Sequence, residues 1–420
     1  MSIGTLENRI GTDASLKTRI GFVVELSRRL HEYGTTAPRL EDVINLVSLR
    51  LGLVCNVLST PTSIVMSFSD PTHDDGLAEI TQVVRMPPGE MNLKRLCQVD
   101  EIADQVIDGH LDLDAGRARL REFGEARRSL RFREWLVVSY GVSAGSIALI
   151  LHTGWVGVVV ATLIGLVIGV INEISRWRPN IAAASDALSA LLATLIATSV
   201  AVLVTPFEVR SVVIASLIVL MPGLALTTAV RELSSQHLIS GTARMMGAMA
   251  TLLKLAFGTI AATQLCALVG WVPGPTPEAV VPRWTEWIAV LAAGFAFSVL
   301  FRSPRRYVPV VVGSVVLGYV CTQVGGAYLS PAFGVFVGGL LIGAVSNIFA
   351  RTMQRPGAIV REPGIILLVP GSVAFRSLSF VFQRDVLLGI DTAVTLVTLL
   401  VAIVAGLLFG DLLVPSRRKL

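Results

Sequence analysis

The sequence predicts an α-helical polytopic membrane protein of about ten spans, preceded by a small N-terminal α+β soluble domain. Hydrophobic residues make up 53% of the chain and charged residues only 15%, with a mean hydropathy of +0.70. Soluble domains carry about 25% charged residues. The charges are also unevenly distributed, because 36 of the 65 Asp, Glu, Lys and Arg residues lie within residues 1–133. We therefore expect a cytoplasmic domain over 1–133 and a lipid-embedded remainder.

The predicted soluble domain begins with a helix. Residues 15–31 space their apolar side chains as an amphipathic helix does, and a second helix is expected from Arg39 to Leu51. Short runs rich in β-branched residues then indicate a small antiparallel sheet, followed by two polar helices. We expect the strands over 54–60, 63–68 and 79–86, and the two helices over 91–108 and 112–126.

Ten apolar stretches of the remainder approach the ~20 residues that a helix needs to cross a bilayer. They lie near 134–151, 154–172, 184–204, 211–230, 245–270, 286–301, 306–323, 332–350, 358–376 and 391–413. With the N-terminus inside, the cytoplasmic connections hold 17 Lys and Arg residues and the outer ones hold 4, as the positive-inside rule requires. Residues 1–20 lack the apolar segment of a signal peptide. Both termini are therefore predicted to be cytoplasmic.

A proline-rich segment divides the membrane region into two halves of five spans. It forms a predicted extracytoplasmic linker over 272–285, between a first repeat over 134–271 and a second over 286–420. The halves resemble each other weakly, because a Pro-Gly pair recurs in the fourth and the ninth span. Since each half has an odd number of spans, such a repeat must be inverted in the membrane, as in many secondary transporters.

The recurring pairs are Pro222-Gly223 and Pro370-Gly371. Proline removes a backbone donor and clashes with the preceding turn, and glycine weakens a helix further. Both spans should therefore break near mid-membrane and expose helix termini whose partial charges can hold ions or a zwitterion. The alternative is a simple proline kink, which is common in membrane helices.

Four polar residues of the predicted spans are candidate transport residues: Asp186, Lys254, Asn347 and Arg361. Ionisable groups at bilayer depth usually face a cavity or a partner, because their burial in lipid is costly. Asp186 could exchange a coupling proton, and Lys254 could be its ion-pair partner or extend to an interface. Arg361 could bind a substrate carboxylate in bidentate fashion, or it could mark a cytoplasmic helix end.

Several function classes are excluded by what the sequence lacks. It has no nucleotide-binding lysine loop and no hydrolase or metalloprotease signature. The scattered cysteine and histidine residues give no metal-ligand spacing. No basic patch with interleaved aromatic residues indicates nucleic-acid binding. We expect a non-enzymatic transporter without cofactor or metal, whose partners are a small-molecule substrate, protons and the lipid bilayer. A homo-oligomer is compatible with this interpretation.

Several segments resemble the threonine/serine exporter family in its fused single-chain form. The resemblance extends from about residue 22 to the end of the chain, and the order of the segments makes it specific. The segments are LSRRLHEYGTTAPRLEDVINLVSLRLGL (26–53), TPTSIVMSF (60–68), VRMPPGEMNLKRL (84–96), VDEIADQVIDGHLDLDAGRARL (99–120), MPGLALTTAVREL (221–233), SGTARM (240–245) and LVPGSVAFRSL (368–378).

The resemblance implies proton-coupled export of threonine and serine across a bacterial plasma membrane. Many relatives carry an acidic residue near the position of His237, and this chain departs from the family there. Two alternatives stay open. Some split relatives are associated with dicarboxylate export, so the substrate could be a succinate-like C4-dicarboxylate. The chain could also be a membrane receptor whose soluble domain senses a ligand.

Overall fold

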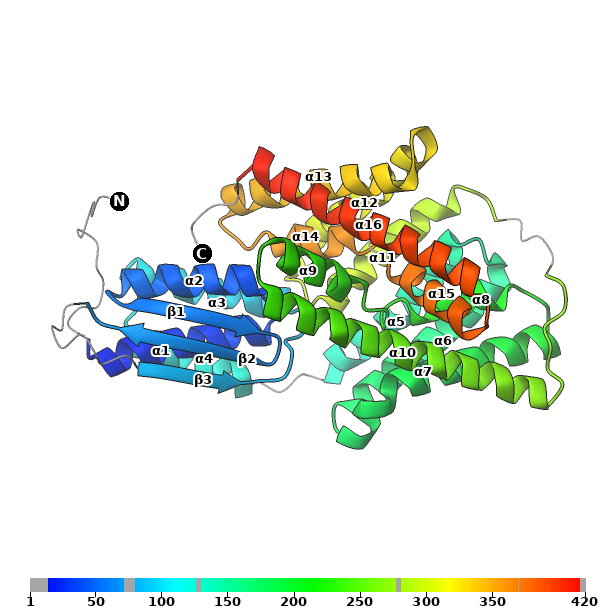
Figure 1. Cartoon of the computed structure of the whole chain (residues 1–420), viewed down its shortest axis with the longest axis horizontal. Helices are drawn as coiled ribbons and strands as arrows, with labels where there is room; N and C mark the ends of the chain where they lie inside the picture. Colours follow the sequence, from blue (N-terminus) through cyan, green and yellow to red (C-terminus); the bar gives the residue numbers. More distant parts are fainter. Residues whose placement is uncertain (1–13, 72–79, 126–129, 277–280, 369, 416–420) are drawn as a thin grey trace.

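The structure, a computed structural model, has two regions packed end to end (Figure 1). The N-terminal region, up to residue 125, contains the only sheet among the described residues, and the helical region begins at residue 130. The described residues are 14–71, 80–125, 130–276, 281–368 and 370–415.

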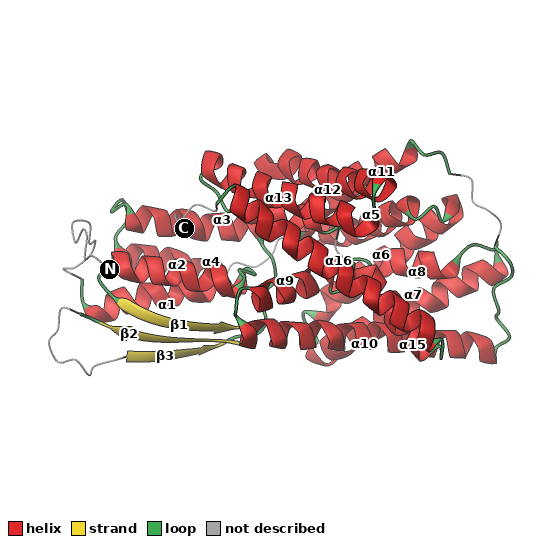
Figure 2. Cartoon of the chain, turned by 45° about the horizontal axis from the view of Figure 1, so that its top comes forward, coloured by secondary structure: helices red, strands yellow, loops and turns green. Residues whose placement is uncertain are grey.

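The N-terminal region is a three-stranded antiparallel sheet with helices on one face (Figures 1 and 2). The strand order is β1-β2-β3, and Met66 of β2 lies opposite Val57 of β1 and Gln82 of β3. The elements lie where the sequence pattern predicts them. They are α1 (Leu16–Glu32), α2 (Ala37–Arg50), β1 (Val54–Thr60), β2 (Ser63–Ser69), β3 (Ile80–Arg85), α3 (Leu93–Ile107) and α4 (Leu113–Glu125).

Buried and half-buried residues alternate along β2, which explains why one face of the sheet is covered by helices. Ile64, Met66 and Phe68 are buried, whereas the residues between them are half-buried. Successive strand residues point to opposite faces, so all three apolar side chains face the helices. They join one core with residues such as Phe22 and Leu26 of α1.

The helical region contains twelve α-helices within its described residues. Six of them are long and apolar enough to cross a bilayer: α6, α7, α10, α12 with its preceding 3-10 turn, α13 and α16. The bounds are α5 (Leu130–Ile150), α6 (Gly154–Ser175), α7 (Pro179–Leu203), α8 (Val209–Leu217), α9 (Gly223–Ser234), α10 (Leu238–Leu268), α11 (Thr285–Leu300), α12 (Val308–Tyr328), α13 (Pro331–Met353), α14 (Ala358–Ile365), α15 (Gly371–Phe382) and α16 (Val386–Leu413).

The fourth and ninth expected spans are each divided into two short helices. The first consists of α8 and α9, and the second of α14 and α15. Each α-helical residue adds about 1.5 Å, so none of these short helices alone covers the ~30 Å hydrocarbon core. The number of crossings therefore depends on how the short helices combine, and ten spans stays a prediction.

The two halves of the helical region repeat one pattern of neighbours. In the first half, α5 packs on α6 and α8, α7 packs on α10, and α9 packs on α10. In the second half, α11 packs on α12 and α14, α13 packs on α16, and α15 packs on α16. Equivalent helices of the two halves also make equivalent contacts across the boundary between the halves. The helix α15 packs on α10, α9 packs on α16, and the two initial helices α5 and α11 pack on each other.

The two regions share a core. Leu93, at the start of α3, is fully buried among Phe297, Phe301 and Ile359 of the helical region. Backbone bonds support this contact, since the amide of Leu93 donates to the carbonyl of Phe301 at 3.0 Å. As Figure 2 shows, the sheet and its helices lie at one end of the long helices. The N-terminal region is thus packed against that end.

Candidate functional site

The two helix breaks meet. Pro222 precedes α9 and Pro370 precedes α15, with almost identical backbone angles of φ −80°, ψ 40° and φ −80°, ψ 41°. A Cβ atom added to Gly371 would lie 3.3 Å from the Cα of Gly223 and 3.4 Å from its nitrogen. Two chain segments 148 residues apart therefore come into backbone contact, which glycine permits because it has no side chain.

This contact brings two helix N-termini together. Gly223 and Gly371 are the first residues of α9 and α15. The first four amides of a helix lack partners within it, and the helix dipole places about half a positive charge there. Two adjacent N-termini therefore favour an anionic group such as a carboxylate.

A cavity of about 340 Å³ lies beside the first break. That volume is within the usual range of small-ligand sites. Gly223, Leu224 and Ala225 of α9 line it together with Gly371 of α15. The remaining lining is mainly apolar, with polar side chains from α5, α6, the residues that follow α6 and α11, and the loop between β3 and α3. It comprises Glu90, Met91, Leu136, Tyr140, Asn172, Arg176, Ile218, Val219, Met221, Pro222, Phe297, Leu300, Phe301, Arg302 and Ile366.

Charged residues gather at the mouth of this cavity. Arg176 is the C-cap of α6, and Arg302 follows α11. Both donate to the carboxylate of Glu90, which belongs to the loop between β3 and α3. No local sequence pattern indicates this triad, because the two arginines lie at the ends of expected spans and Glu90 lies in the predicted soluble domain.

Asp186 and Lys254 form the predicted ion pair. The Nζ atom of Lys254 on α10 lies 3.4 Å from Oδ2 of Asp186 on α7. Neither residue lines the 340 Å³ cavity. The pairing agrees with the expectation that an intramembrane charge has a partner, while the role of Asp186 in proton coupling stays a prediction.

Asn347 and Arg361 come together in a second polar cluster. Arg361 donates to Oδ1 of Asp411 at 2.7 Å and to Oδ1 of Asn347 at 3.2 Å. The amide of Asn347 donates to the same Asp411 oxygen at 2.7 Å, and Arg231 lies 3.7 Å from the other one. Arg361 therefore already binds a protein carboxylate. Asp411 was missed, although it is a lone acid in an apolar run.

A larger cavity of about 770 Å³ separates this cluster from the N-terminal region. Arg361, Asn347 and Asp411 form one wall, and Arg39 and Asp100 of the N-terminal region lie on the other. Burial raises the pKa of Asp100 to about 7, against the opposing effect of Arg39. The cavity thus holds charges of both signs and one carboxyl group that titrates near neutrality.

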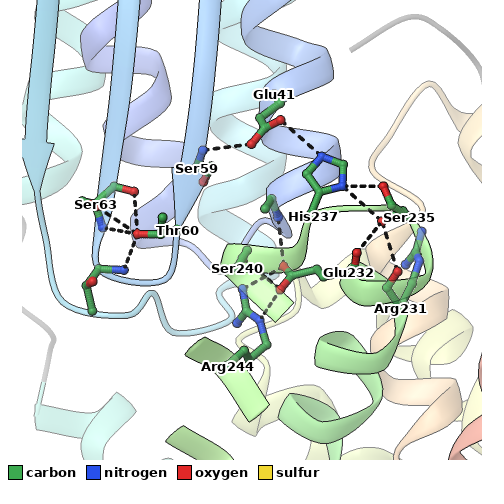
Figure 3. A network of polar contacts seen from close by, with 12 residues as sticks. Glu41, Ser59, Thr60, Ser63, Arg231, Glu232, Ser235, His237, Ser240 and Arg244 are labelled. Atoms are coloured by element: carbon green, nitrogen blue, oxygen red, sulfur yellow. Dashed lines mark hydrogen bonds and ion pairs between the residues drawn. The ribbon is translucent and has the colours of Figure 1, made fainter. Parts of the chain in front are cut away.

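Figure 3 shows how polar contacts connect the two regions at the start of α10. Glu232 is fully buried and accepts from Nε and Nη2 of Arg244, both at 3.0 Å, and from Ser240. It also accepts from the backbone amide of Ala37, the first residue of α2, at 3.1 Å. A buried bidentate pair of this kind is strongly directional, so it fixes α9 and α10 relative to α2.

His237 makes a second connection within the same network. Its Nε2 atom lies 3.2 Å from Oε2 of Glu41 on α2, and the other carboxylate oxygen accepts from the amide of Ser59. The imidazole Nδ1 lies 2.9 Å from the carbonyl of Ser235. His237 therefore contacts the N-terminal region (Figure 3).

Comparison with known proteins gives relatives over most of the chain. Pheromone-regulated membrane protein 10 of Eremothecium gossypii is 27% identical over 375 residues, which cover 87% of this chain and 50% of that protein. The Saccharomyces cerevisiae protein of the same name is 26% identical over 410 residues, covering 93% of this chain and 51% of its own. The chain thus spans about half the length of these relatives. No solved structure matches it.

Two family models match consecutive parts of the chain. Residues 21–266 match the ThrE model of threonine/serine exporters, and residues 286–413 match a second model, "Threonine/Serine exporter, ThrE". The first match covers the N-terminal region and the first half of the helical region, and the second match covers the other half. The chain therefore belongs to the threonine/serine exporter family, with both family domains fused in one polypeptide.

Proposed function

We propose that this protein is a secondary transporter that exports threonine and serine, driven by the proton gradient. The observation that carries the proposal is the meeting of two helix N-termini beside a cavity of about 340 Å³. The N-termini suit the substrate carboxylate, and backbone carbonyls freed at the same breaks suit its ammonium group. Family membership supports the substrate class.

The proposed mechanism is alternating access around the two breaks. The matching helix contacts of the two halves support an inverted repeat of five spans each, with the first over 134–271 and the second over 286–420. Relative movement of two similar bundles around a fixed central site is the usual mechanism of such folds. In the proposed topology the N-terminal region and both termini are cytoplasmic, in the plasma membrane of a bacterium.

The decisive experiment is efflux of radiolabelled threonine from proteoliposomes that contain the purified chain, with and without an imposed pH gradient. We expect flux that depends on the gradient and is inhibited by unlabelled serine. Absence of threonine and serine flux from folded, correctly oriented protein would overturn the substrate assignment.

A C4-dicarboxylate is the second candidate substrate, and one observation favours it. Arg176 and Arg302 at the mouth, together with the two helix N-termini, provide positive potential at two places along one cavity. A dianion needs two such places, whereas a zwitterion needs one. Inhibition of threonine flux by succinate, or succinate flux in its place, would identify this alternative.

A further inference from the structure

The carboxylate of Glu90 lies between two guanidinium groups at the mouth of the 340 Å³ cavity beside the helix breaks, here called the break cavity. Its Oε2 atom lies 2.8 Å from Nη2 of Arg302 and 3.1 Å from Nη2 of Arg176, and Oε1 lies 3.4 Å from the same Arg176 nitrogen. The arginines come from the ends of two different helices, α6 and α11. Each guanidinium thus uses one terminal nitrogen, and the two together give the carboxylate charge-assisted hydrogen bonds from both sides.

The loop that carries Glu90 is held in place by the residues that follow it. The amides of Leu93 and Lys94 donate to the carbonyls of Phe301 and Arg302, both at 3.0 Å, and Leu93 is fully buried in the helical region. Arg302 has φ 53°, in the left-handed region. These backbone bonds therefore hold the residues that follow Glu90 against the residues that end α11.

The carboxylate lies on the outer side of the two arginines. The Glu90 side chain is 60% exposed, whereas Arg176 and Arg302 are 25% and 13% exposed. The Nε–H group of Arg302 is buried and has no acceptor among the residues that the structure describes. Glu90 can therefore leave toward solvent, and the terminal guanidinium nitrogens to which it is bound can then meet another carboxylate.

Electrostatics agree with this geometry. Although the Glu90 side chain is largely exposed, nearby protein partly desolvates its carboxyl group, which by itself raises the pKa. Arg176 and Arg302 outweigh that effect and hold the pKa below the usual value. Glu90 is therefore ionised at neutral pH, as a substrate carboxylate is.

We propose that Arg176 and Arg302 form a carboxylate-binding site at the mouth of the transport cavity, and that Glu90 is an internal ligand which the substrate carboxylate displaces. This inference rests on the proposed transport function. It gives the N-terminal region a defined task, because its Glu90 side chain occupies the mouth until a substrate carboxylate displaces it.

The proposal predicts effects of opposite sign within one triad. Removing the internal competitor in Glu90→Gln frees both arginines, so we expect threonine to bind roughly two- to fivefold more tightly, the range typical of one exposed ion pair. Arg302→Gln removes a donor to the substrate and should weaken binding by a similar factor. A triad that only holds the two regions together would lose binding in both variants.

The experiment is equilibrium binding of radiolabelled threonine to the full-length protein in detergent. Wild type, Glu90→Gln, Arg302→Gln and the matched control Glu101→Gln are compared, together with their thermal unfolding temperatures. Glu101 is a suitable control because it also joins the N-terminal region to the helical region, through Arg355 at 3.0 Å, and it does not line the break cavity. Unchanged binding in Glu90→Gln, or weaker binding than in the control, would overturn the proposal.

A second measurement does not depend on the substrate. Met91→Cys places a thiol on the cavity wall beside Glu90, and its labelling by a water-soluble maleimide can be followed at that site by peptide mass spectrometry. We expect faster labelling with Glu90→Gln than with Glu101→Gln in the same background. Faster labelling in a protein that binds neither threonine nor serine would support the closing of the cavity mouth by Glu90 and overturn the proposed substrate. Equal labelling rates with normal threonine binding would overturn the proposed closing of the cavity mouth by Glu90, and not the transport function.

Discussion

At the scale of single residues, the Asp186–Lys254 pair is the leading candidate for proton coupling. It joins α7 to α10 within the first half of the helical region. A carboxylate that pairs with a lysine can release the lysine when it takes up a proton, which changes the attraction between the two helices. The pair could thus connect protonation to movement of α7 and α10.

We predict that Asp186→Asn abolishes threonine efflux against a concentration gradient but preserves threonine–threonine exchange. The neutral side chain cannot carry the coupling proton, whereas exchange needs only the substrate site. The measurement compares gradient-driven efflux with exchange in proteoliposomes. Asp391→Asn serves as the control, because Asp391 is an exposed acid near the start of α16. Loss of exchange together with efflux, or retention of both, would remove Asp186 from the coupling mechanism.

A second prediction concerns Asp100, whose pKa is raised to about 7 mainly by burial. Since the ordinary value is 3.8, the folded protein binds a proton that the unfolded chain releases between about pH 4 and 7. Stability should therefore fall as pH rises through this window. Asp100→Asn should remove the dependence and stabilise the protein at pH 8 by on the order of 2–4 kcal/mol.

Thermal unfolding at pH 5 and pH 8 tests this expectation. The exposed Asp108, at the end of α3, provides the control substitution Asp108→Asn. A wild-type unfolding temperature that does not fall between these two pH values, relative to Asp100→Asn, would contradict it.

At the scale of elements, the two broken spans show where sequence reasoning succeeded. Pro-Gly pairs at matching positions predicted the interruptions, because proline and glycine act on the local backbone. The sequence did not show that the interruptions touch. That contact requires α9 and α15 to cross between halves, which depends on helix packing rather than on local preference.

The contact between the breaks can be tested with one substitution. Gly371→Val places a branched side chain against the backbone of Gly223, and overpacking of a tight site typically costs about 1–3 kcal/mol. We expect threonine flux to fall about tenfold or more. Gly313→Val is the matched control, since a Cβ at Gly313 on α12 meets no atom within 4 Å. Equal flux in the two variants would show that close approach of the breaks is dispensable.

At the scale of the whole molecule, the N-terminal region is part of the helical core and not an appended module. Leu93 and Cys97 are buried among helices of the second half, and Glu232 connects α9 and α10 to α2. Deleting the first 130 residues would therefore expose apolar core and remove the Ala37 amide that donates to Glu232. Point substitutions at the interface are the better probes of its role.

We predict that Glu232→Gln destabilises the protein by about 1–3 kcal/mol, because the fully buried carboxylate is the shared acceptor of Arg244, Ser240 and the Ala37 amide. Glu41→Gln should cost less than about 1 kcal/mol, since the Glu41–His237 contact is partly exposed to solvent. Thermal unfolding of both variants in the same detergent gives the comparison. Similar unfolding temperatures would show that the Glu232 network does not hold the two regions together.

The sequence by itself determined the composition-driven and local features of this protein. Apolar length predicted membrane helices, alternation predicted the strands, and Pro-Gly pairs predicted the breaks, since each depends on neighbouring residues. Only the tertiary structure decided which distant groups meet. In the tertiary structure Gly223 contacts Gly371, Asp411 accepts a hydrogen bond from Arg361, and Glu90 lies at the cavity mouth. These contacts are set by the packing of segments tens to hundreds of residues apart, and no local pattern encodes that packing.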